Sequence, residues 1–95
     1  MNKHKIQLQF ISQIWQEGKK YVSFAPQLQV ASCGNTKEQA QKNLIEALEG
    51  FIETARDMGT LEEILEESGF VSRENRKKEW IAPEIVSFER TSLVV

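Results

Sequence analysis

Cysteine and histidine are almost missing from this chain of 95 residues, which has one of each. The single cysteine, Cys33, excludes an internal disulfide and any cysteine-rich zinc site. We expect its side chain to fill a small space in the core at the end of a strand, as free cysteines commonly do. The single histidine, His4, lies among the first residues, which are poorly ordered in most domains, so it offers no well-ordered centre for a catalytic triad.

Long apolar runs and glycine clusters are missing too. The first residues interleave polar and apolar side chains, so no apolar segment of a signal peptide is present. No run approaches the ~20 apolar residues of a membrane-spanning helix. The five glycines stand singly at turn positions, which excludes a phosphate-binding glycine-rich loop. These absences predict a cytoplasmic protein without a membrane segment.

The remaining composition is that of a small folded domain. Hydrophobic residues make up 40% of the chain and charged residues 27%, which argues against disorder over the whole chain. A chain of this length removes roughly 60–65% of its unfolded surface from water on folding. We therefore expect one domain over residues 1–95 with a single, thin core.

The first third of the chain predicts three strands. Apolar residues alternate with glutamines at its start, which indicates a strand over residues 5–15, bulged near Ser12. A short polar segment that contains Gly18 predicts a hairpin into a second strand over Lys20–Ala25. A third, short strand is predicted over residues 28–32.

The middle of the chain predicts two helices. Apolar residues recur at three- and four-residue steps, which indicates an amphipathic helix over residues 37–57 that lies across the sheet. Thr36 and Gln39 have the spacing of a capping box at its start, and Thr60 repeats that signature before a short second helix. Gly69 is placed as the residue that ends the second helix.

The end of the chain predicts a charged loop over residues 71–82 and then a strand over residues 83–95, which is rich in β-branched and aromatic residues. The whole order is β-β-β-α-α-β. This order predicts a single α+β domain in which one long helix covers a small sheet, with the core over about residues 5–70.

The predicted last strand is also a candidate for contact between copies of the chain. The apolar residues proposed for that contact are Ile85, Val86, Phe88 and Leu93. An exposed strand edge can take a strand from a second copy, whereas pairing inside the monomer is the simpler alternative. Both remain open, because a strand has two edges. We expect a homo-oligomer.

Charge is distributed unevenly, although the net charge is only −2. The acids between residues 46 and 67 are Glu46, Glu49, Glu53, Asp57, Glu62, Glu63, Glu66 and Glu67, and Arg56 alone opposes them. A solvated helix face explains those on the long helix. The dipole of the second helix favours Glu62 and Glu63 at its start, but it disfavours Glu66 and Glu67 in its last turn. We therefore take Glu62, Glu63, Glu66 and Glu67 as the candidate binding residues for a basic partner.

A smaller basic cluster suggests a rival hypothesis. Its members are Arg73, Arg76, Lys77 and Lys78, close in sequence to Trp80. Such a cluster can contact phosphates, and a tryptophan can stack on a base. Glu74 and Glu79 dilute the cluster and the whole chain is acidic, so a solvated loop is the alternative.

Four stretches of this sequence together resemble the HicB-like antitoxin domain. They are YVSFAPQL at residues 21–28, ASCGNT at 31–36, EQA at 38–40 and LIEAL at 44–48, and the match extends over about residues 6–55. The resemblance implies a partial ribonuclease-H-like β-β-β-α-β fold. It also implies an antitoxin of a type II toxin–antitoxin system, which neutralises a small basic toxin, a HicA-like ribonuclease, by covering it.

Members of that family often carry a C-terminal DNA-binding module as well. Residues 71–95 are too short for a helix-turn-helix, so we expect no separate DNA-binding domain, and binding of promoter DNA is in doubt. Enzymes of the ribonuclease H type hold metal ions between carboxylates, one of them usually on the first strand. No Asp or Glu occurs between Ile6 and Trp15, which leaves Glu46 and Glu49 as the only plausible contributors.

The sequence therefore predicts a non-catalytic binding domain, with no catalytic residues, metal or cofactor. Antitoxin activity is the first hypothesis. The alternatives are an orphan oligomeric or regulatory domain of the same fold without a cognate toxin, and a weak nucleic-acid-binding module.

Overall fold

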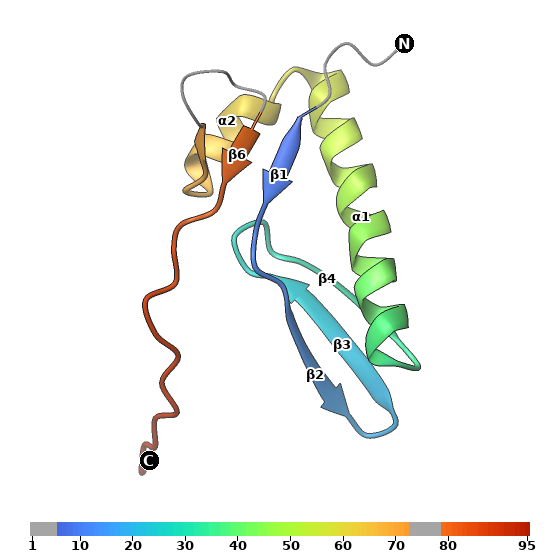
Figure 1. The fold of residues 1–95 in the computed structure, drawn as a ribbon, viewed down its shortest axis with the longest axis vertical. Coiled ribbons are helices and arrows are strands. Elements are labelled where there is room, and N and C mark those ends of the chain that lie inside the picture. The colour runs from blue at the N-terminus through green and yellow to red at the C-terminus, as the bar shows by residue number, and fades with distance from the viewer. Residues whose placement is uncertain (1–5, 73–78) are drawn as a thin grey trace.

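The computed structural model describes residues 6–72 and 79–95, and it is an α+β arrangement of two small sheets beside one long helix (Figure 1). The strands are β1 (Gln7–Gln9), β2 (Gln13–Glu17), β3 (Lys20–Ala25), β4 (Val30–Gly34), β5 (Val71–Ser72) and β6 (Glu79–Ile81), and the helices are α1 (Lys37–Met58) and α2 (Leu61–Glu67). One sheet has the order β1-β6-β5 and the other the order β2-β3-β4. Within the described residues, no helix is long and apolar enough to cross a membrane.

The first strand is divided into β1 and β2, which corrects the prediction of one bulged strand over residues 5–15. β2 pairs antiparallel with β3, and Gln13 lies opposite Phe24 at the end of that ladder. The ladder stops there because Pro26 follows β3 and has no N–H to donate. β1 instead pairs in parallel with β6, a strand from the far end of the sequence.

β4 begins at Val30 and not at residue 28 as predicted. Gln29 takes a left-handed φ of 57°, and its N–H donates to the Ala25 carbonyl at 2.8 Å. This turn connects β3 to β4 and leaves Leu28 outside the ladder, where it is buried at 8% exposure. The residue expected in a strand therefore contributes to the core from a turn.

The cap of α1 forms as predicted. The Thr36 hydroxyl accepts a hydrogen bond from the Gln39 N–H at 3.0 Å, and the Gln39 side-chain oxygen accepts one from the Asn35 N–H at 2.6 Å. Two N–H groups near the start of the helix are thereby satisfied by side chains. The predicted repeat at Thr60 is wrong, because its side chain makes no capping bond and its hydroxyl lies 3.4 Å from the Ala55 carbonyl oxygen.

The end of α2 confirms the predicted role of Gly69. This residue has a left-handed φ of 92°, and its N–H donates to the Glu66 carbonyl. The N–H of Phe70 donates to the Leu65 carbonyl at 2.9 Å. The two bonds form a Schellman motif, and they turn the chain so that Phe70 enters the core at 4% exposure.

The core lies between α1 and the sheets. Its buried members are Ala25, Leu28, Leu44, Leu48, Ala55, Leu61, Leu65, Phe70, Trp80 and Ala82. Trp80 and Ala82 extend it beyond the predicted limit of about residue 70. The start of α1 sits directly on the second sheet, where the buried Ser23 hydroxyl donates to the Ala40 carbonyl at 2.7 Å.

Gly34 allows this close approach, and its replacement by alanine is a test of it. A Cβ at Gly34 would lie 2.6 Å from the Ala40 nitrogen and 2.9 Å from the Gln39 carbonyl carbon, both backbone atoms. We expect Gly34→Ala to lower the free energy of unfolding by about 1–3 kcal/mol, as overpacking does. Urea denaturation measures this change.

Gly50 provides the matched control for that substitution. It lies within α1, and a Cβ there would meet nothing within 4 Å. Gly50→Ala should raise the free energy of unfolding by about 0.5–1 kcal/mol, because alanine loses less backbone entropy in a helix. Equal effects of the two substitutions would contradict the close contact at Gly34.

The predicted strand over residues 83–95 does not form, which corrects the expected last element. These residues carry no regular secondary structure and run away from the rest of the chain (Figure 1). β6 forms earlier, inside the predicted charged loop, where Trp80 is buried at 2% exposure. The pairing with β1 ends at Ala82, whose N–H donates to the Gln9 carbonyl at 2.8 Å, and Pro83 follows directly.

Candidate functional site

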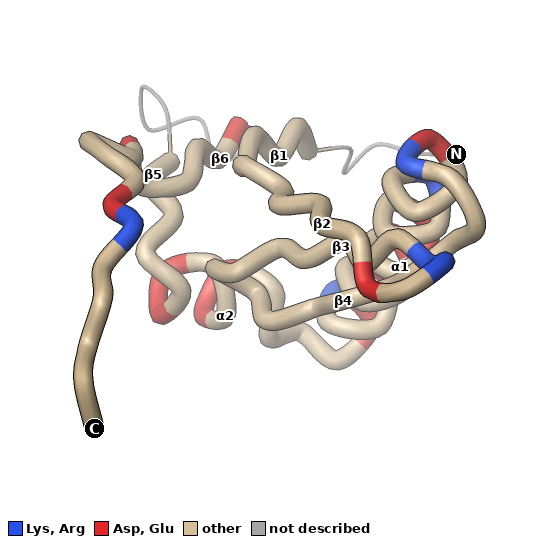
Figure 2. Tube along the Cα trace, turned by 90° about the horizontal axis from the view of Figure 1, so that it is seen from below, with Lys and Arg blue, Asp and Glu red and all other residues tan. Residues whose placement is uncertain are grey.

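An acidic surface covers the outer side of α2. Glu62, Glu63, Glu66 and Glu67 are all exposed, whereas Leu61 and Leu65 on the same helix are buried. Residues four apart share one face of a helix, so two pairs of carboxylates are stacked there one turn apart. Figure 2 shows acidic positions on α2. The structure thus brings the four predicted partner-binding residues together.

The charge of the acidic surface is greatest in the last turn of α2. No basic residue occupies the last turn of α2, where Glu66 and Glu67 lie. The partial negative charge of the helix C-terminus adds to that of these carboxylates, at a cost of roughly 0.3–1 kcal/mol each.

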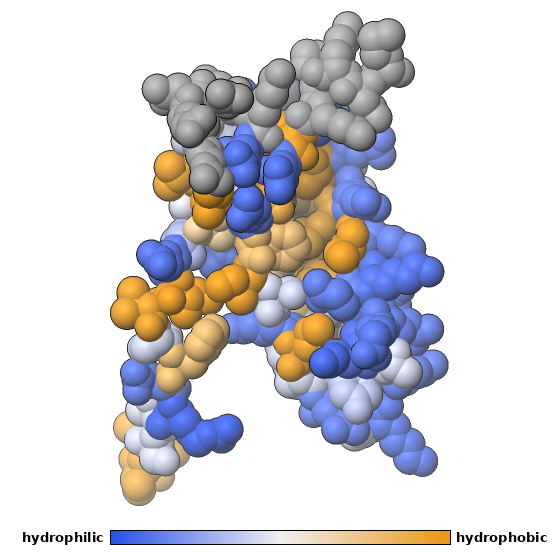
Figure 3. Space-filling view, in the orientation of Figure 1, coloured by the Kyte–Doolittle hydropathy of each residue, from blue (hydrophilic) through white to orange (hydrophobic). Residues whose placement is uncertain are grey.

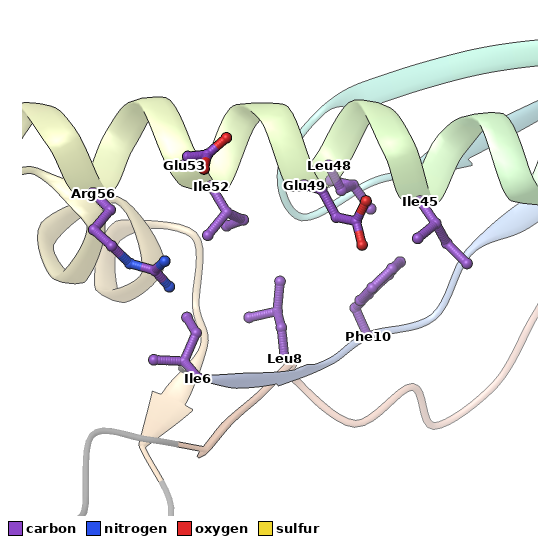
Figure 4. Close-up of a pocket in the computed structure, with 9 residues that line it drawn as sticks. All are labelled: Ile6, Leu8, Phe10, Ile45, Leu48, Glu49, Ile52, Glu53 and Arg56. Atoms are coloured by element: carbon purple, nitrogen blue, oxygen red, sulfur yellow. The ribbon is translucent and has the colours of Figure 1, made fainter. Parts of the chain in front are cut away.

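A second feature is a groove of about 590 Å³ between β1 and α1 (Figure 4). Figure 4 shows Ile6, Leu8 and Phe10 pointing from the β1 segment toward α1. The remaining lining residues come from α1 and are Ile45, Leu48, Glu49, Ile52, Glu53 and Arg56. Sequence reasoning missed the groove, although the alternation of apolar residues before Ile11 already placed three side chains on one face.

The groove has an apolar floor and a charged rim. Its carboxylates, from Glu49 and Glu53, lie on the same helix as the guanidinium of Arg56 (Figure 4). Of the two acids considered above as contributors to a metal site, only Glu49 lines the groove. Within residues 6–72 and 79–95, no three His, Cys, Asp or Glu side chains are grouped so that they could hold a metal ion.

The four apolar candidates near the C-terminus are not joined in a strand. Ile85 is half-buried, while Val86, Phe88 and Leu93 are 94%, 71% and 82% exposed. Within the described residues, this segment therefore pairs with no strand of the monomer. Exposed apolar side chains of this size are the kind that a partner surface covers.

Two other expectations change in the structure. Cys33 is exposed in β4 and does not fill the core, because its side chain lies on the sheet face opposite α1. Trp80 is buried in the core, so stacking of a nucleic-acid base on it, as the rival hypothesis required, is wrong. The basic cluster of residues 73–78 lies outside the described residues.

Comparisons of this chain with protein-family models, with curated proteins and with solved structures found no match.

Proposed function

We propose that this chain is an antitoxin-like protein that binds and neutralises a small basic ribonuclease toxin of the HicA-like kind. The exposed acidic surface of α2 carries the proposal, because it gathers four carboxylates on one helix face without a cation in the last turn. The protein acts by binding and performs no chemistry itself. The alternative is an orphan oligomeric or regulatory domain of the same fold.

The order of the elements supports the proposal. Strands β1 to β4 are followed by α1 and α2, and the chain then returns through β5 and β6, with β6 parallel to β1. The resemblance to HicB-like domains implies a β-β-β-α-β order, which β2, β3, β4, α1 and β6 follow. The motifs that carry this resemblance lie in β3, β4 and the first half of α1.

The mechanism is electrostatic attraction followed by steric exclusion. A ribonuclease that binds RNA needs a basic surface for phosphates. The acidic surface of α2 would attract that same surface, raise the association rate at low salt and keep RNA away from it. Because the charges are exposed, the attraction should weaken as salt rises above about 0.1 M.

The test is reversal of two charges on the acidic surface. We expect Glu66→Lys with Glu67→Lys to slow association with the toxin about 10-fold or more at low salt, and to weaken the salt dependence. The toxin to use is the small basic protein encoded beside this chain, and stopped-flow mixing measures the rate. Lysines in the last turn of α2 suit the helix dipole, so misfolding would not explain a loss.

Glu46→Lys with Asp57→Lys is the matched control, because both acids are exposed on α1 and the charge change is the same. This control should keep most of the association rate. Equal rates for the two double variants would show that the acidic surface of α2 is not the toxin site. Absence of a small basic protein encoded beside this chain would favour the orphan domain.

A further inference from the structure

The β2-β3-β4 sheet has an outer face that no element of the described chain covers. Cross-strand partners share one face of a sheet, so Trp15, Val22 and Cys33 form one row across the three strands. Ser23, on the opposite face, points to α1 and bonds to Ala40. The row of Trp15 therefore faces away from the helix.

The middle of this outer face is apolar, whereas the row nearest the hairpin turn is charged, because Glu17 lies opposite Lys20 and accepts a hydrogen bond from the Trp15 indole N–H at 2.7 Å. Its next row consists of Gln13, Phe24 and Ala31, and the ring of Phe24 meets that of Trp15 edge-on at 6.4 Å between centroids. Trp15 is 40% exposed, and Ala31 and Cys33 are exposed as well. A solvated face of an antiparallel sheet is normally polar. An apolar one marks a contact surface.

The C-terminal arm, defined as residues 83–95, lies on the same side of the molecule as this outer face. In Figures 1 and 2 the arm and α1 are on opposite sides of the β2-β3-β4 sheet. Figure 3 shows open space between the arm and the body of the molecule. Val86 and Val94 are 94% and 97% exposed, so the arm brings further apolar surface to this space.

The exposed area is larger than a monomer of this size should have. The chain exposes 7463 Å². A compact monomer of 10.9 kDa exposes roughly 5,600 Å², about 1,900 Å² less. Likewise, the radius of gyration is 15.3 Å, against about 12.4 Å for a compact chain of this length. A stable dimer buries about 800 Å² on each partner, so the excess suffices for one such interface.

We propose that a second copy of this chain occupies this space, so that the two outer faces pack against each other and each arm lies along the partner. In a two-fold contact each surface meets itself. The rows of Trp15 and Phe24 contain no charged residue, and the third row pairs Glu17 with Lys20, whose charges are opposite, so identical faces meet without net repulsion. The proposal does not rest on toxin binding, because α2 takes no part in it.

The test is the mass in solution, measured by light scattering over a range of concentrations, together with one substitution in the outer face. The native chain should have twice the mass of 10.9 kDa. Trp15→Glu places a charge in the centre of the face and should raise the dimer Kd by about 30-fold or more. Met58→Glu, at a residue 70% exposed at the end of α1, should leave the Kd unchanged.

Two further measurements distinguish the contribution of the outer faces to the dimer from the contribution of the arm. Cys33 lies in the row of Trp15, so its reaction with a bulky maleimide should be slow in concentrated protein and fast after dilution or in Trp15→Glu. Deletion of residues 84–95 should also raise the Kd. The proposal is overturned by a 10.9 kDa mass at all concentrations, by an unchanged Kd in Trp15→Glu, or by a Cys33 rate independent of concentration.

Discussion

Replacement of Trp80 by alanine is expected to lower the free energy of unfolding by about 3–5 kcal/mol. Trp80 is 2% exposed, and it lies in β6, the middle strand of its sheet, opposite Leu8 of β1 and Ser72 of β5. Its loss would leave a cavity where the start and the end of the chain meet. A domain of this size has a free energy of unfolding of only about 5–14 kcal/mol, so the substitution would remove a large part of it.

Urea denaturation followed by far-UV circular dichroism measures the effect of Trp80→Ala. The control is Met58→Ala, because Met58 is large and apolar but 70% exposed. Its replacement should change the free energy of unfolding by no more than about 0.5 kcal/mol. A loss below about 1 kcal/mol in Trp80→Ala would contradict the position of β6 in the core.

Leu44→Ala should lower the free energy of unfolding by about 2–5 kcal/mol. Leu44 is fully buried on the side of α1 that contacts the second sheet. In a domain of this length each kcal/mol corresponds to about 4–8 °C in the unfolding midpoint. Differential scanning calorimetry should therefore show a decrease of about 10 °C or more.

The next residue along the helix is the control. Ile45 is 43% exposed at the edge of the groove between β1 and α1, so Ile45→Ala removes a side chain that water already reaches. We expect a loss of about 1 kcal/mol or less. If the two alanine variants melted at the same temperature, the orientation of α1 would be wrong. Association of two copies raises apparent stability, so all variants are compared at one protein concentration.

The toxin and the dimer experiments can fail separately. Glu66 and Glu67 lie on α2, whereas Trp15 and Cys33 lie on the outer face of the β2-β3-β4 sheet. A charge change on α2 therefore leaves the proposed dimer contact intact. Trp15→Glu in turn leaves the acidic surface of α2 unchanged. Toxin binding by this variant therefore also shows whether dimerisation matters for inhibition of the toxin.

Local structure followed from the sequence. The spacing of apolar residues predicted α1 almost to its last residue, and Thr36 predicted its cap, because both depend on neighbours within one or two helical turns. Gly69 predicted the end of α2 for the same reason, since a left-handed residue favours glycine. The acidic surface could also be predicted, because residues four apart on a helix necessarily share a face.

The tertiary structure alone decided which strands pair and which faces are covered. β1 takes β6 as its parallel partner, although residues 83–95 have the stronger strand propensity, because β6 carries Trp80, which is buried in the core. Cys33 is exposed because α1 covers only the other face of its sheet. Pairing joins residues about 70 positions apart, and periodicity within a segment carries no information about such a partner.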